Sequence, residues 1–174
     1  MTDTARSLSA LQTLLADNVA EDITPQDLRD MLVSCLGIYG SISCFEYYTQ
    51  QDNPDSGAKL TCFDTDGNAF GVTVDNTTDS ITIDIDGNYD ITFQASLYGT
   101  AGASTKFRLR INGVEQNFGC NVTLAAANGI ASVSFLASGI SLVATDVLTI
   151  YVEMSGSTDD FSIVDAQFTV RMIG

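Results

Sequence analysis

The feature that most constrains the fold is a long run of short β-type segments after residue 40. Each segment is rich in β-branched, aromatic and other apolar residues, and Gly, Asn or Asp stands between most of them. Short strands at this even spacing are typical of an antiparallel sandwich or barrel. The expected strands are Ile42–Thr49, Lys59–Phe63, Ala69–Asp75, Ser80–Asp86, Tyr89–Tyr98, Thr105–Ile111, Gln116–Leu124, Ile130–Leu136, Val147–Ser155 and Phe161–Ile173.

Period-two alternation supports the strand assignment. In the segment 80–86 isoleucines alternate with polar residues, and in 107–111 Phe, Leu and Ile alternate with two arginines. Successive side chains of a strand point to opposite faces, so each segment has one apolar and one polar side. Asn112-Gly113 follows directly and predicts a two-residue type I′ hairpin.

The first 40 residues instead predict two short amphipathic helices. The second helix has an N-cap at Thr24, a proline at the first helical position and a stop at Gly37. Helices this short are marginal alone, so we expect them to dock on the sandwich, a sister chain or a larger assembly. The apolar candidates for capsid or trimer contact are Ile23, Leu28, Met31, Leu32 and Leu36. The chain therefore divides into a helical attachment or trimerisation arm, residues 1–40, and a β domain, residues 41–174.

Charge excludes several classes of partner. The chain has 7 Lys and Arg against 22 Asp and Glu, a net charge of −15, which repels nucleic acid phosphates and anionic membranes. We also expect no membrane insertion, because no window approaches the ~18 apolar residues of a spanning helix. The N-terminus lacks a basic region followed by an apolar run, so we expect no signal-peptide secretion and a cytosolic origin.

Catalytic equipment is sparse. The chain has no His, which removes Ser-His-Asp and Cys-His catalysis, and we expect no enzymatic activity. Cys35, Cys44, Cys62 and Cys120 lack the close spacing of a zinc site and are interpreted as free thiols. A Cys44–Cys62 disulfide is left open, because sequence does not give the separation of the two residues.

Two acidic turns are the only metal candidates in the sequence. The segments DTDGN and DIDGNYD place oxygen-bearing side chains at alternate positions around a glycine, as calcium loops do. Asp and Asn before Gly are also ordinary hairpin residues, and the full EF-hand series is missing. Plain turns are the preferred interpretation, and no other cofactor is expected. The calcium candidates are Asp64, Asp66, Asp84, Asp86 and Asp90.

The order of motifs in the β domain resembles the C1q/TNF-like family. The motif residues are Gly87, Tyr89, Asn112, Gly113, Leu142, Asp146 and Phe168. This resemblance implies a jelly-roll β-sandwich that assembles as a homotrimer, with the short N-terminal helical arm attached. Thr145 replaces the glycine that the family usually has before the Asp of the penultimate strand.

The N-terminal segment LLADNVAEDITPQDLRDMLVSCLGIYGS is similar to leader segments of bacteriophage virion proteins. Together the two resemblances imply a structural virion protein. It would be a trimeric decoration, cement or head-fibre protein on the outer capsid surface, made in the host cytoplasm, with the major capsid protein as partner.

A second interpretation places the chain at the phage tail. The alternative is a receptor-binding tail fibre or tip protein that recognises host surface glycans through the loops Gly99–Ser104 and Ser155–Asp160. Tyr98 and Tyr151, near strand ends, either pack or stack on sugars. A nonviral assembly or adhesion module also stays open.

Overall fold

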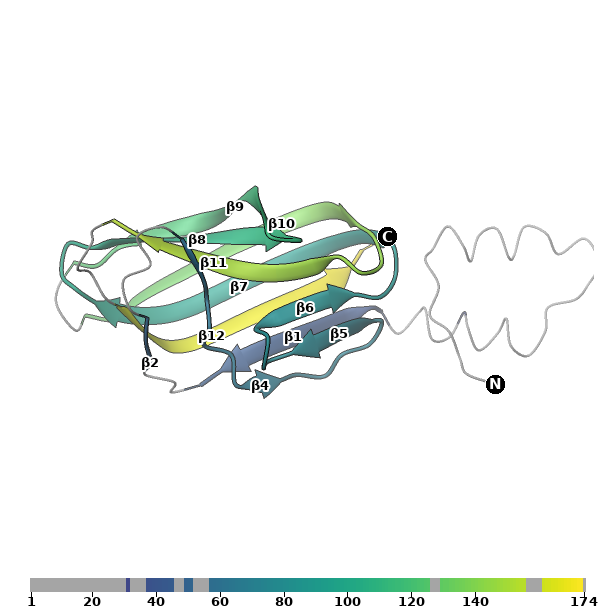
Figure 1. The fold of residues 1–174 in the computed structure, drawn as a ribbon, viewed down its shortest axis with the longest axis horizontal. Helices are drawn as coiled ribbons and strands as arrows, with labels where there is room; N and C mark the ends of the chain where they lie inside the picture. Colours follow the sequence, from purple (N-terminus) through teal and green to yellow (C-terminus); the bar gives the residue numbers. More distant parts are fainter. Residues whose placement is uncertain are drawn as a thin grey trace, which may run out of the picture.

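Two antiparallel sheets lie face to face in the computed structural model of the chain (Figure 1). The structure describes Met31 and residues 37–45, 49–51, 57–125, 129–155 and 161–173. Its strands are β1 (Tyr39–Cys44), β2 (Thr49–Gln51), β3 (Ala58–Lys59), β4 (Thr65–Asp66), β5 (Val72–Asp75), β6 (Ser80–Ile83), β7 (Gly87–Gly99), β8 (Ser104–Ile111), β9 (Val114–Thr123), β10 (Ala131–Leu142), β11 (Val147–Met154) and β12 (Phe161–Met172).

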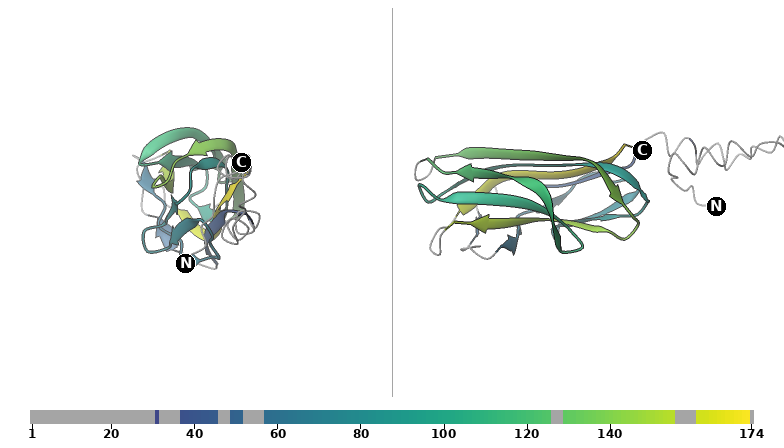
Figure 2. Two further views of the ribbon diagram at one scale, coloured as in Figure 1. Left: turned by 90° about the vertical axis from the view of Figure 1, so that its right-hand side faces the viewer. Right: turned by 90° about the horizontal axis from the view of Figure 1, so that it is seen from above.

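The strand order within the two sheets is that of a jelly roll. Sheet A has the order β10-β7-β12-β1-β4, with β2 beside β12. Sheet B has the order β5-β6-β11-β8-β9, with β3 beside β11. After β9 the chain passes to β10 in sheet A, β11 in sheet B and β12 in sheet A, so it wraps around the core, and Figure 2 shows the two layers. The predicted jelly-roll β-sandwich is confirmed.

Alternating apolar residues from both sheets fill the core. On β7 the inward positions are Tyr89, Ile91, Phe93, Ala95 and Leu97, all buried. The Phe93 ring of sheet A lies 5.3 Å from the Phe107 ring of sheet B, measured between centroids. Burying a large apolar side chain contributes about 1.5–3 kcal/mol to stability. These buried side chains therefore hold the two sheets together.

The local patterns give the expected geometry. The apolar residues of 107–111 face inward, and the two arginines face out. Asn112 and Gly113 have φ values of 52° and 78°, and positive φ at both positions is the requirement of a type I′ turn. The predicted hairpin is confirmed.

Several strand boundaries differ from those expected. β10 continues beyond Leu136 to Leu142, because a bulge between Ala137 and Ile140 absorbs the turn-like Ser-Gly pair. Gly139 has a φ of 70°, which the bulge requires and which glycine adopts without strain. The predicted strand Ile42–Thr49 is wrong, since β1 ends at Cys44 and β2 begins at Thr49.

The sandwich also begins earlier than residue 41. β1 starts at Tyr39, and Ile38 is only 2% exposed, with its carbonyl accepting a hydrogen bond from the Met172 amide. Gly37 has a φ of 81°, the left-handed conformation of a residue that ends a helix. The described sandwich therefore includes residues 38–40, which the sequence analysis assigned to the arm.

The turn between β10 and β11 contains a strained backbone. Thr145 has a φ of 80°, a region that β-branched residues rarely adopt. Its amide donates to the Ile83 carbonyl at 2.7 Å, and the neighbouring Asp146 carboxylate accepts from the Val143 amide at 2.9 Å and from Asn112 Nδ2 at 2.7 Å. These bonds hold the turn in place despite the unfavourable φ.

Candidate interaction site on sheet A

The outer face of sheet A is polar but nearly uncharged. Alternation on β1, β7, β10 and β12 turns one set of residues into the core and leaves Ser, Thr, Gln and Asn facing outward. On these four strands the charged residues at outward positions are Asp90, Asp165 and Arg171. A chain of net charge −15 thus keeps one broad face almost free of charge.

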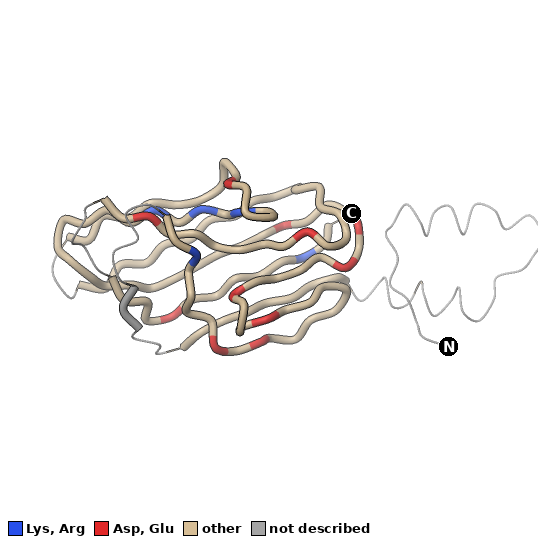
Figure 3. The backbone as a smooth tube through the Cα atoms, in the orientation of Figure 1, with Lys and Arg blue, Asp and Glu red and all other residues tan. Residues whose placement is uncertain are grey.

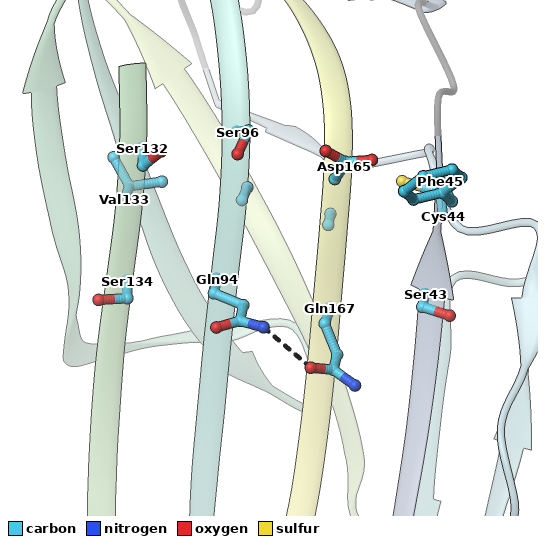
Figure 4. A pocket seen from close by; sticks show the side chains of 12 residues that line it. Ser43, Cys44, Phe45, Gln94, Ser96, Ser132, Val133, Ser134, Asp165 and Gln167 are labelled. Atoms are coloured by element: carbon cyan, nitrogen blue, oxygen red, sulfur yellow. Dashed lines mark hydrogen bonds between the residues drawn. The ribbon is translucent and has the colours of Figure 1, made fainter. Parts of the chain in front are cut away.

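A shallow hollow of about 600 Å³ crosses this face (Figure 4). Small serine side chains leave the space, and the amide of Gln94 on β7 donates to the Gln167 carbonyl oxygen on β12 at 2.9 Å. The outward-facing residues around it are Ser43, Phe45, Gln94, Ser96, Ser132, Ser134, Asp165 and Gln167. Hydroxyl and amide groups both donate and accept hydrogen bonds, so the hollow is equipped for binding.

Apolar side chains are also exposed on this face of sheet A. Phe45 is 75% exposed and Leu136 is 58% exposed, and Tyr39 and Ile173 are also exposed here. These are four of the seven large apolar side chains that the described residues expose. Exposed apolar groups that lie close together mark interaction sites, so Phe45 and Leu136 beside the polar hollow make this face a candidate contact surface.

Sequence reasoning missed this site because its four strands come from distant parts of the chain. One local signal was present: "TFQAS" and "SVSFL" carry no charge at any position, although the chain is strongly acidic. That signal indicates an uncharged surface, but only the pairing of β10, β7 and β12 brings the segments together.

The calcium candidates of the first acidic turn each have another partner. Asp64 accepts from the Thr65 hydroxyl at 2.8 Å, and Asp66 accepts from the Asn76 amide at 2.7 Å. Both carboxylates therefore satisfy local turn donors, as Asp does in ordinary turns.

The carboxylates of the second acidic turn bond to three different parts of the chain. Asp84 accepts from the Thr73 hydroxyl at 3.2 Å, Asp86 from an amide of the β10–β11 turn at 2.6 Å, and Asp90 from an amide of the β10 bulge at 3.3 Å. Within the described ranges, no three His, Cys, Asp or Glu side chains lie together as a metal site. The structure does not bring the five candidates around one point.

Of the five arm candidates, the structure describes Met31 alone, with a helical backbone and a half-buried side chain. Ile23, Leu28, Leu32 and Leu36 lie outside the described residues. Their contacts stay a prediction.

Cys44 and Cys62 lie side by side in the core as free thiols. The Cys62 thiol hydrogen-bonds to Cys44, and this bond together with burial raises the pKa of Cys62 well above its usual range. Burial also raises the pKa of Cys120 to about 11. These two thiols therefore stay protonated at neutral pH, and Cys35 lies outside the described residues.

The candidate glycan loop Gly99–Ser104 lies at the end of the sandwich opposite Tyr39, because β12 pairs Arg171 with Tyr39 and Phe161 with Gly99. The Gly102 amide donates to the Leu124 carbonyl at 2.6 Å, and the Ser155 amide donates to the Ser104 carbonyl at 2.9 Å. These bonds tie the loop Gly99–Ser104 to its neighbours. Residues 156–160 lie outside the described part.

In the described part of the chain, no helix is both long and apolar enough to cross a bilayer. No protein-family model matches the sequence, and a search of curated proteins finds no match.

Solved structures do match the fold. The Eiger TNF of S. frugiperda superimposes with a TM-score of 0.56 at 10% sequence identity, over 79% of this chain and 93% of that one. The globular domain of zebrafish complement 1qA gives a TM-score of 0.55 at 16% identity, over 79% of this chain and 98% of that one. The chain thus has the C1q/TNF-like jelly-roll fold that its motif order resembles.

Proposed function

We propose that the chain is a structural virion protein that forms a homotrimer through the outer face of sheet A. The observation that supports this most is the contrast between a net charge of −15 and the few charges on this face. Copies of a strongly acidic chain repel one another, so a stable contact requires a face where like charges do not meet.

The composition of the face suits such a contact. Phe45 and Leu136 would lose their exposed apolar surface against neighbouring copies, and burial of apolar area is the main favourable term in association. The serine and glutamine groups of the hollow would pair across the interface directly or through water. A stable interface needs about 800 Å² per partner, and the four long strands of sheet A offer a face of suitable breadth.

The polarity of the sandwich gives the assembly two different ends. β1 begins at Tyr39 at one end of the sandwich, while the loop Gly99–Ser104 lies at the opposite end. In a trimer three arms would leave from one end and contact the major capsid protein, and their linkage would multiply weak individual contacts. The phage setting is supported by the N-terminal resemblance, and the outward end suits either capsid decoration or the alternative role in glycan recognition.

Light scattering after size exclusion tests the assembly. The wild-type chain should have three times the monomer mass, and Ser134→Glu should dissociate it, because Ser134 lies in the hollow and three added carboxylates would face one another. Thr123→Glu is the matched control, since it adds the same charge on β9 of sheet B and should leave the trimer intact. A monomeric wild type, or equal dissociation by both variants, contradicts the proposed interface.

Immunogold microscopy of phage particles tests the location. Label over the heads is expected, and label only at tail tips would favour the receptor-binding alternative. Deleting residues 1–36 should abolish capsid attachment and leave a folded trimer, because the cut spares the buried Ile38. Full capsid occupancy by the truncated chain would refute the role of the arm.

A further inference from the structure

Basic residues gather on one surface of this acidic molecule. Of the seven Lys and Arg in the chain, five are described, and four of these lie on sheet B (Figure 3). The fifth, Arg171, lies on sheet A. The four residues Lys59, Lys106, Arg108 and Arg110 are called here the basic stripe.

Strand geometry aligns three of these cations. Lys106, Arg108 and Arg110 occupy alternate positions of β8, so they share its outer face at intervals of about 7 Å. Tyr151 of β11 lies beside them in the register, and the Arg110 guanidinium stacks over its ring with Cζ 3.7 Å from the centroid. Tyr151 therefore packs against an arginine and fixes its plane.

A glycine on the neighbouring strand makes room for Arg108. Arg108 pairs with Gly119 across β8 and β9, and a Cβ at Gly119 would overlap the Phe107 carbonyl oxygen and come within 2.6 Å of Arg108 Nη1. Arg108 Nη1 donates to the Phe107 carbonyl at 3.1 Å, which holds the guanidinium flat across the sheet. Beside it lies a polar hollow of about 400 Å³, whose other polar lining residues include Glu115, Gln116, Asn117 and Asn121.

The nearby carboxylates do not neutralise this surface. Glu115 Oε1 lies 4.0 Å from Arg108 Nε, and its Oε2 lies 3.7 Å from Arg110 Nη2, both long for ion pairs. Lys106 pairs with Glu153 at 3.2 Å. The three cations on β8 thus have only two carboxylates beside them, those of Glu115 and Glu153. In addition, Arg110 Nε has no hydrogen-bond partner among the described residues.

We infer that the basic stripe and its adjoining hollow bind an acidic saccharide. A guanidinium recognises a sugar carboxylate through charge-assisted hydrogen bonds, and the Gln116, Asn117 and Asn121 amides both donate to and accept from sugar hydroxyls. Cations about 7 Å apart suit a sparsely charged chain. DNA carries a charge every ~1.7 Å, a density that these few cations do not match. The site lies on the sheet opposite the proposed trimer face, so it stands independently of that proposal.

Isothermal titration of the full chain with oligogalacturonate, which carries a carboxylate on every sugar, tests this inference. The carboxyl-reduced oligosaccharide is the ligand control. Arg108→Gln and Arg110→Gln should each weaken binding at least tenfold, because each removes a charged hydrogen-bond donor. Arg171→Gln is the matched control, because it removes the same charge from sheet A and should leave the affinity unchanged.

Several results would overturn the inference. These are absence of oligogalacturonate binding by the wild type, equal binding of the carboxyl-reduced sugar, an equal loss with Arg171→Gln, or tighter binding of a single-stranded DNA oligomer. Thermal melting checks that each variant folds. If either arginine variant does not fold, Lys106→Gln, at a more exposed position of the stripe, serves for the same comparison.

Discussion

Replacing Thr145 with glycine should stabilise the fold. The residue has a φ of 80°, and a non-glycine residue in such a region costs about 1–3 kcal/mol. Glycine loses about 0.5–1 kcal/mol more backbone entropy on folding than a residue with a Cβ. The difference leaves a gain of about 1 kcal/mol in the free energy of unfolding, at the position where C1q/TNF-like chains usually have glycine.

Urea unfolding and thermal melting of Thr145→Gly measure this gain. A change of about 1 kcal/mol should raise the melting temperature by about 2–4 °C for a chain of this length. Thr145→Ala is the matched control, because it keeps the Cβ and hence the strain, and it should show no comparable gain. Equal stabilisation by Ala and Gly would refute the argument from backbone strain, and so would a destabilised glycine variant.

The core, one buried carboxyl and the acidic turns give three further predictions. Phe107→Ala should lower the free energy of unfolding by about 3–5 kcal/mol in a urea titration, because the ring is fully buried between Phe93 and Phe161. Burial raises the pKa of Asp79, so the folded state binds this proton more tightly than the unfolded state, and stability falls as pH rises from about 4 to the raised value. Asp79→Asn removes this titration, so its stability relative to wild type should rise between pH 3 and pH 7, as compared by urea unfolding. Millimolar calcium should leave the melting temperature unchanged, because the acidic turns use their carboxylates locally, and a clear rise would contradict that account.

The sequence predicted those features of the fold that depend on only a few neighbouring residues. Alternation in 80–86 and 107–111 and the pair Asn112-Gly113 identified strands and a hairpin, since these signals act over a few residues. The expected strand Ile130–Leu136 stopped short of the observed end of β10 at Leu142, because a bulge is recognisable only when the partner strand β7 is known.

The sites were less accessible to sequence reasoning because they depend on sheet register. The hollow on sheet A joins Ser43, Gln94, Ser134 and Gln167 from four separate strands. The alternation in 107–111 placed two arginines on an outer face, but the contact between Arg110 and Tyr151 follows from the pairing of β8 with β11. No short-range pattern encodes either arrangement.

The position of β1 determines how the sandwich would respond to mechanical load. β1 runs antiparallel beside β12, in register from the pair Tyr39–Arg171 to the pair Cys44–Ala166, and the chain enters it directly from Gly37. A pull on Gly37, opposed by an object held at the far loops, acts along the length of β1. Its ladder of hydrogen bonds is then loaded in shear and must break together, whereas a sideways pull would open the pairs one at a time. The rate of unfolding governs survival under force, so this geometry would let a tethered domain resist detachment by flow or collision.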